Sequence, residues 1–256
     1  MESSRRKFLK IAGLSVLGVG AKPVLDSLVQ AGEPTYATDQ EALEGTHWAM
    51  VVDMKKCRDD CRDCITACHR GHNVPEINNA KHEIKWIWNE DFKHAFPTQE
   101  HEHLAERLER QPFMVLCNHC DNPPCVRVCP TQATFKRKED GVVMMDFHRC
   151  IGCRFCMAAC PYGSRSFNWF NPRNYLDDTN PDFPTRAKGV VEKCNFCAER
   201  LAIGKIPLCV EACKEKALVF GDLDDPNSEV RKILRERFSI RRKPGLGTGP
   251  NIFYVI

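Results

Sequence analysis

The sequence lacks any apolar run long enough to cross a lipid bilayer as a helix. Its longest candidate, Ile11–Ala21, has about eleven residues, whereas a membrane-spanning helix needs ~20. The C-terminal run Ile252–Ile256 has the length of a strand. We therefore expect no transmembrane helix in the mature chain, so that any membrane attachment comes from a partner or from a retained N-terminal segment.

The sequence also has little net charge and lacks common catalytic motifs. Its formal net charge is +3 at pH 7, which argues against a nucleic acid as partner. It contains no nucleophile elbow, phosphate-binding loop or dinucleotide fingerprint. No substrate site is therefore visible, and whether the chain itself catalyses a reaction stays open.

Cysteine, by contrast, is abundant. All sixteen cysteines fall into four groups of four, the first to fourth quartets. These are Cys57, Cys61, Cys64 and Cys68; Cys117, Cys120, Cys125 and Cys129; Cys150, Cys153, Cys156 and Cys160; and Cys194, Cys197, Cys209 and Cys213. The third reads C-x2-C-x2-C-x3-C-P, the run that holds [4Fe–4S] clusters in bacterial ferredoxins. The sequence therefore predicts up to four clusters and a role in storing and passing electrons.

The spacing has a physical reason. Three cysteines separated by two residues can surround one face of a cubane cluster, while the fourth points away and binds the other cluster of a pair. Pro130 and Pro161 follow the inner quartets, and proline helps turn the chain away because it lacks an N–H and restricts the residue before it. His119 lies inside the second quartet. We expect it to hydrogen-bond near a cluster sulfur, not to be a ligand.

Two other interpretations of the cysteines stay open at this point. Sixteen cysteines in an exported chain can form eight disulfides, and thiolate quartets can hold structural zinc. Disulfides across two- or three-residue spacings within one short loop would be strained. A zinc ribbon takes two cysteine pairs from separate knuckles and does not crowd four thiols into about eleven residues. The quartets therefore favour clusters over a zinc- or disulfide-stapled binding protein.

The N-terminus, Ser4–Lys10 followed by the apolar run, resembles a twin-arginine export signal through Arg5 and Arg6. We place the signal at residues 1–31, with cleavage after Val29-Gln30-Ala31. Such signals imply export of an already folded protein, which would allow clusters to be inserted in the cytoplasm. The resemblance implies a periplasmic or extracytoplasmic location.

The remaining chain divides into an α+β domain over residues 32–224 and a C-terminal helix and tail over 225–256. The pair Asp140-Gly141 predicts a hairpin between strands at 133–137 and 142–145. We expect further strands at 83–88, 164–167, 217–220 and 252–256, a helical turn at 199–201, and a surface loop at 171–190. Asp225 and Pro226 predict the start of a helix that ends near residue 238.

The quartet order, with Cys117–Cys125 and Cys194–Cys197, resembles the four-cluster iron–sulfur subunits of membrane-linked reductases. This family includes electron-transfer subunits of dimethyl sulfoxide, polysulfide and formate-dependent nitrite reductase systems. The resemblance implies two ferredoxin-like [4Fe–4S] halves fused into one domain with loop insertions, and ligands exchanged between quartets. The implied cluster ligands are Cys57, Cys61, Cys64 and Cys213; Cys194, Cys197, Cys209 and Cys68; Cys117, Cys120, Cys125 and Cys160; and Cys150, Cys153, Cys156 and Cys129.

Within this family, the segments Lys55–Cys64 and Glu83–Trp88 are most similar to DsrO, the exported subunit of the DsrMKJOP complex associated with dissimilatory sulfite reduction. That similarity implies a polytopic quinone-reactive membrane subunit, a multihaem cytochrome c, and a cytochrome b with a cytoplasmic iron–sulfur subunit as partners. The alternative is an electron-transfer subunit of a molybdopterin reductase of polysulfide or dimethyl sulfoxide type.

The outer quartets depart from the family pattern. Three residues separate Cys57 from Cys61 where the family has two, and His69 and Lys214 replace the proline after the last cysteine. The acidic side chains between Cys57 and Cys64 should disfavour reduction of a cluster there. These departures make the outer pair of clusters the less secure prediction.

Overall fold

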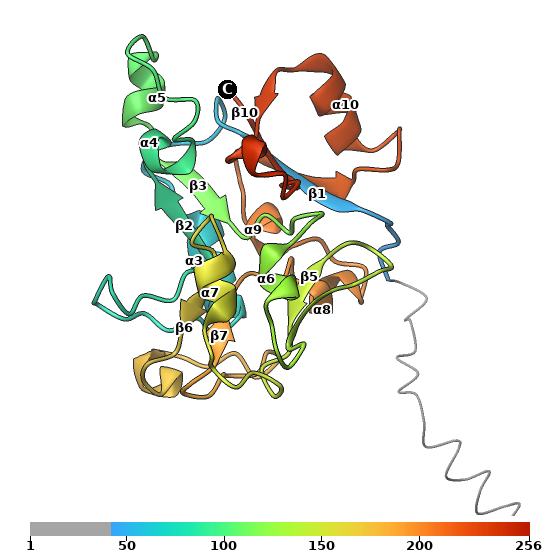
Figure 1. The fold of residues 1–256 in the computed structure, drawn as a ribbon. Helices are drawn as coiled ribbons and strands as arrows, with labels where there is room; N and C mark the ends of the chain where they lie inside the picture. Colours follow the sequence, from blue (N-terminus) through green and yellow to red (C-terminus); the bar gives the residue numbers. More distant parts are fainter. Residues whose placement is uncertain (1–41) are drawn as a thin grey trace, which may run out of the picture. The chain divides into compact units, whose positions relative to one another are not determined.

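The computed structural model describes residues 42–256, which form a mixture of short helices and short strands, as the α+β prediction requires (Figure 1). The predicted export signal, residues 1–31, lies outside the described residues. Over residues 42–256, no helix has the length and apolar character needed to cross a membrane.

The largest sheet joins the beginning of the described chain to its end. Its strands follow the order β8 (Leu218–Asp222), β1 (Trp48–Asp53), β10 (Ile252–Val255) and β9 (Ser239–Ile240). β1 pairs antiparallel with β8 and parallel with β10, and β9 pairs antiparallel with β10. Figure 1 shows β1 beside β10 and α10. Part of the 225–256 segment is thus a component of this sheet.

β1 is buried along its whole length because both faces of the sheet are covered. Met50 and Val52 belong to the main core, whereas Ala49 and Val51 pack with Val230 of α10 (Glu229–Glu236). This alternation follows the two-residue period of a strand. The central strand is therefore fixed from both sides.

Three two-stranded ribbons make up the remaining sheet structure of the described residues, and all are antiparallel. They are β2 (Ile87–Glu90) with β3 (Phe113–Leu116), β4 (Thr134–Lys136) with β5 (Val143–Met145), and β6 (Ser166–Phe167) with β7 (Val191–Glu192). The hairpin predicted around Asp140-Gly141 is confirmed, and Gly141 has the positive φ of +74° that such turns need. The strands predicted at 164–167, 217–220 and 252–256 are present with shifted ends.

Most helices are only one or two turns long, and four of them carry cysteines. They are α3 (Asp63–Gly71), α4 (Phe92–Ala95), α5 (Glu106–Arg110), α6 (Pro124–Arg127), α7 (Phe155–Ala159), α8 (Ala198–Leu201), α9 (Leu208–Glu211) and α10, with 3-10 turns η1 (Pro172–Tyr175) and η2 (Pro244–Leu246). α3 packs against α9, and α6 packs against α7. Helices of the first and fourth quartets thus lie together, as do those of the second and third.

Two predicted elements are corrected. The strand expected at 83–88 begins only at Ile87, because the Lys85 N–H donates to Ser166 Oγ at 2.7 Å instead of to a strand partner. The last long helix begins at Glu229, where Ser228 Oγ accepts the Arg231 N–H at 3.2 Å. Asp225 does not cap this helix, because its carboxylate accepts the Asn227 N–H in a preceding turn.

The predicted surface loop at 171–190 is exposed along much of its length but is anchored by a buried ion pair. Arg186 Nη2 lies 2.6 Å from Glu192 Oε2, and both side chains are fully buried. The Arg186 guanidinium also donates to the backbone oxygens of His72 and Asn73. The loop therefore ties the end of α3 to strand β7.

Candidate iron–sulfur sites

The structure gathers the sixteen thiols, all of them free, into groups that cross the quartet boundaries. We name four groups by their cysteines. Site A contains Cys57, Cys61, Cys64 and Cys213; site B contains Cys68, Cys194, Cys197 and Cys209; site C contains Cys117, Cys120, Cys125 and Cys160; and site D contains Cys129, Cys150, Cys153 and Cys156. In each group three cysteines come from one quartet and the fourth comes from another.

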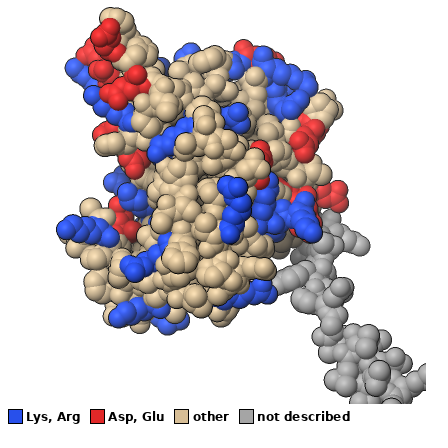
Figure 2. Space-filling view, in the orientation of Figure 1, with Lys and Arg blue, Asp and Glu red and all other residues tan. Residues whose placement is uncertain are grey.

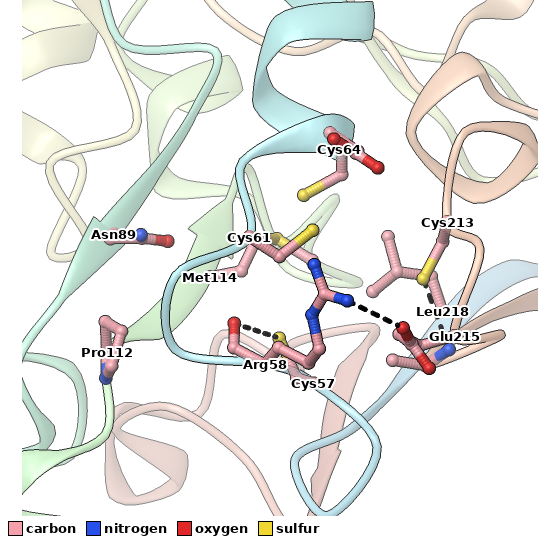
Figure 3. Close-up of a pocket in the computed structure, with 12 residues that line it drawn as sticks. Cys57, Arg58, Cys61, Cys64, Asn89, Pro112, Met114, Cys213, Glu215 and Leu218 are labelled. Carbon is pink, nitrogen blue, oxygen red and sulfur yellow. Dashed lines mark hydrogen bonds and ion pairs between the residues drawn. The ribbon is translucent and has the colours of Figure 1, made fainter.

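Site A is a pocket whose four cysteines come from the loop after β1, from α3, and from the turn after α9 (Figure 3). Arg58 Nη1 lies 3.3 Å from Glu215 Oε1, so an ion pair joins the Cys57 loop to the Cys213 turn. Burial, followed by the neighbouring thiols, raises the pKa of Cys57 to about 11 and that of Cys64 to about 12. These thiols would be protonated at neutral pH unless a metal stabilised the thiolates.

Site B is the most deeply buried group, and every one of its cysteines is less than a tenth exposed. Burial, followed by the thiols of Cys194, Cys209 and Cys197, raises the pKa of Cys68 well above its usual value. The Phe196 and Leu208 N–H groups donate to the Cys194 and Cys197 sulfurs, each at 3.4 Å. Such donors stabilise thiolates and tune a bound cluster.

His72, Cys197 and Glu199 bring three candidate metal-ligand atoms within 4.8 Å of one another beside site B. The His72 ring nitrogens already face oxygen acceptors, with Nδ1 2.8 Å from Cys68 O and Nε2 3.0 Å from Glu199 Oε1. Although burial opposes it, the hydrogen bond from His72 lowers the pKa of Glu199 below its ordinary value. These groups satisfy one another and support site B, so they do not form a separate metal site.

Site C is a pocket between the second quartet and Cys160, the last cysteine of the third. Burial, followed by Cys117, raises the pKa of Cys120 to about 12. Arg165, only 4% exposed, lines this pocket, and its Nη2 donates to Cys125 Sγ at 3.1 Å. A buried guanidinium thus contacts a candidate cluster ligand.

Site D lies under the β4–β5 hairpin, where Cys129, Cys150 and Cys156 pack into one small apolar cluster. Cys153 lies in the loop that leads into α7. The Thr134 N–H donates to Cys129 Sγ at 3.5 Å, and this bond with neighbouring donors outweighs burial and lowers the pKa of Cys129. Gly152 (φ +69°) lets this loop pass close to Gly189, because a Cβ here would lie 2.3 Å from the Gly189 oxygen.

The composition of these sites fits iron–sulfur clusters. Each cubane needs four thiolates, and the chain supplies four groups of four cysteines. Two buried cations, Arg165 and Lys193, have no carboxylate partner within residues 42–256 but lie among the thiols. Because an unpaired buried charge is costly, their counter-charge fits the negative charge of thiolate-bound clusters.

Arg165 and Lys193 are the functional residues that sequence reasoning missed. Arg165 is predicted only as a residue of a short strand, and Lys193 not at all. Their signal is weak: Lys193 directly precedes Cys194, and Arg165 follows Cys160 by five positions. Only the structure shows that both side chains are buried.

Fold and sites together define a ferredoxin-type protein that binds iron–sulfur clusters. A model of the 4Fe-4S dicluster domain matches residues 110–173 and 181–223. The Hdr-like menaquinol oxidoreductase iron–sulfur subunit 1 of Archaeoglobus fulgidus is 41% identical, over 98% of this chain and 97% of that one. The chain belongs to this family of iron–sulfur subunits.

Two further relatives extend the comparison. The menaquinone reductase iron–sulfur cluster-binding subunit of Nitratidesulfovibrio vulgaris is 35% identical, over 81% of this chain and 88% of that one. The matching tetrathionate reductase subunit of Salmonella typhimurium is 36% identical, over 100% of this chain and 89% of that one. The predicted family is thereby confirmed, whereas the narrower similarity to DsrO stays a prediction.

Proposed function

We propose that sites A to D each hold one [4Fe–4S] cluster and that the chain passes electrons along them as a subunit of a membrane-bound, quinone-linked oxidoreductase. A cluster of this type accepts and releases one electron. The protein's own residues supply the thiolates, exclude water and set the local charge. On this proposal sites A and B form one ferredoxin-like half, and sites C and D form the other.

The observation that carries the proposal is the exchange of ligands along four short helices. The last cysteine of each quartet follows its predecessor by four residues, on or directly after a helix, and lies in a different site. The pairs are Cys64 with Cys68, Cys125 with Cys129, Cys156 with Cys160, and Cys209 with Cys213. Side chains four apart on a helix are neighbours, about 5–6 Å apart at Cβ. Two clusters held this way would be close enough to exchange electrons readily.

Metal and sulfide analysis tests this core proposal. Protein purified without oxygen should contain about sixteen irons per chain and as much acid-labile sulfide, because each cubane holds four of each. EPR during a redox titration should then resolve several interacting clusters. About eight irons would mean that one pair of sites is empty, and colourless protein containing zinc would overturn the proposal.

We place the protein outside the cytoplasm, because its N-terminus resembles a twin-arginine signal. Changing Arg5 and Arg6 together to lysine should leave the cluster-loaded protein in the cytoplasmic fraction of the native host. Lys7→Arg serves as a matched control that changes a neighbouring basic residue. Normal export of the double variant would contradict this location.

The partners we propose are those of a DsrMKJOP-type complex: a polytopic quinone-reactive membrane subunit, a multihaem cytochrome c and the remaining subunits. The two relatives named for menaquinol and menaquinone support the quinone-linked part. The tetrathionate reductase relative favours a second candidate, electron delivery to a molybdopterin-containing catalytic subunit. Complex isolated from native membranes should contain haem c and no molybdenum in the first case, and molybdenum in the second.

A further inference from the structure

Sites B and C approach each other where their two cysteine loops meet. His119 lies between Cys117 and Cys120, and Phe196 lies between Cys194 and Cys197. The two rings stack with centroids 3.8 Å apart and planes at 16°. The sulfurs are close as well, because after burial the Cys117 thiol is the largest contribution that raises the pKa of Cys194, to about 12. This contact is therefore the junction between the A–B half and the C–D half.

Lys193 brings a cation into this junction. Its side chain is only 1% exposed, and its Nζ donates to the backbone oxygens of Val143 and Cys194. No carboxylate lies within ion-pair distance of it in the described chain, whereas the equally buried Arg186 is paired with Glu192. An ammonium group has three N–H donors, so one remains for a partner other than these two carbonyls.

The charges that act on Lys193 identify that partner. Burial lowers the pKa of Lys193, while the thiols of Cys117 of site C and Cys194 of site B oppose this effect. An ammonium buried without a counter-charge would be costly. Bound clusters on both sides of the junction would provide that counter-charge.

His119 adds an unpartnered donor at the same place. Its Nδ1 accepts the Val143 N–H at 3.2 Å, so in the neutral ring the proton lies on Nε2. Burial, with Lys193 and Arg165 nearby, lowers the pKa of His119 well below its usual value, so the ring is neutral. The Nε2 atom is buried and has no partner among the described residues. A buried N–H without an acceptor is costly, and a cluster sulfur of site C would supply the acceptor.

We infer that Lys193 sets the reduction potentials of the clusters in sites B and C together, assisted at site C by the His119 Nε2–H, so that electrons cross between the halves at this junction. The inference rests on the proposed function. A positive charge beside a cluster stabilises the added electron and raises the potential. Lys193 is a potential-setting residue and touches no substrate.

The test is an EPR-monitored redox titration of the full-length protein after its iron content has been measured. Lys193→Met should lower two midpoint potentials, those of sites B and C, and leave those of sites A and D in place. Lys193→Arg, which keeps the charge, should restore most of the shift. The exposed Lys188→Met serves as a control that removes the same charge from the surface. Unchanged midpoints, or an equal shift of all of them, would overturn the inference.

A second variant decides the matter if Lys193→Met does not retain its clusters. His119→Gln keeps a polar side chain but removes the ring N–H, so the site C midpoint should fall while that of site A stays fixed. If that midpoint does not move, the inference is wrong. Wild-type protein that contains no iron would instead contradict the proposed function itself, so the two failures are distinguishable.

Discussion

Arg165 is buried on the wall of site C, with one nitrogen on a cysteine sulfur and the other on a hydroxyl. Nη2 donates to Cys125 Sγ at 3.1 Å and Nη1 donates to Thr134 Oγ1 at 2.8 Å. Although burial opposes it, the thiols of Cys125 and Cys156 raise the pKa of Arg165 further. These two cysteines belong to sites C and D, so one guanidinium serves both members of that pair.

Replacing Arg165 by methionine should lower the midpoint potentials of the site C and site D clusters while those of sites A and B stay unchanged. The charge that favours the added electron is lost, and Cys125 loses a hydrogen bond. Redox titration followed by EPR measures this. Arg127→Met is the matched control, because Arg127 is exposed on α6 beside the same site. A shift confined to site B would contradict the expectation.

Sequence reasoning identifies the cysteines but not the cations beside them. Cysteine spacing is a local property, and the quartets carry it in full. The burial of Arg165 depends on the packing of β6, β4 and α6, and its position in a predicted strand gives no sign of which face it occupies. His119 is identified only because it lies between two cysteines.

Asp53, at the end of β1, gives a pH-dependent prediction. Burial opposes its charge, but two hydrogen bonds from Arg237, one of them 3.0 Å long, outweigh burial and hold the pKa of Asp53 below its ordinary value. The stabilisation is therefore complete above the unfolded-state pKa of about 4 and is lost as the pH falls through the lower folded-state pKa.

Arg237→Met should reduce the free energy of unfolding by about 1–2 kcal/mol at pH 7, less than for a fully buried pair because Arg237 is about a third exposed. The difference from wild type should shrink as the pH falls through about 4, since a protonated Asp53 needs no cation. Denaturant unfolding from pH 4 to 8 measures this. Arg235→Met, which removes an exposed charge from α10, should show neither effect. A difference independent of pH would contradict the expectation.

At the scale of elements, local patterns predict some boundaries and miss others. The β4–β5 hairpin follows from Asp140-Gly141, because a tight turn depends on its own residues. β2 starts later than the alternation at 83–88 suggests, since Trp86 donates to Glu192 at 2.9 Å and Lys85 bonds Ser166. Both partners are distant in sequence, so no local pattern could reveal them.

The start of α10 provides a test between two caps. Ser228→Ala should lower the free energy of unfolding by about 1 kcal/mol, because the Arg231 N–H loses its acceptor. Asp225→Ala, which removes only a turn hydrogen bond outside the helix, should cost less than half of that. Denaturant unfolding of the two variants measures the difference. An equal or reversed order would show that the helix begins at Asp225.

At the scale of the whole molecule, the chain connects distant segments twice. The central sheet places β1 between β8 and β10, and the sites place Cys213 beside the first quartet and Cys160 beside the second. Spacing alone predicts four groups of thiols, whereas their exchange between quartets could be expected only from the family resemblance. Figure 2 shows acidic and basic side chains interspersed over the displayed face, so surface charge on that face does not identify the sites.

The exchange of ligands predicts which cysteine variants should behave alike. On the arrangement of site C, Cys160→Ser and Cys125→Ser weaken the same cluster although the residues lie in different quartets. Both variants should lose the same EPR signal and up to about four irons per chain. Cys150→Ser, in the same quartet as Cys160, should instead lose the signal of site D. If Cys160→Ser matches Cys150→Ser and not Cys125→Ser, each quartet holds its own cluster and the paired arrangement of the two halves is wrong.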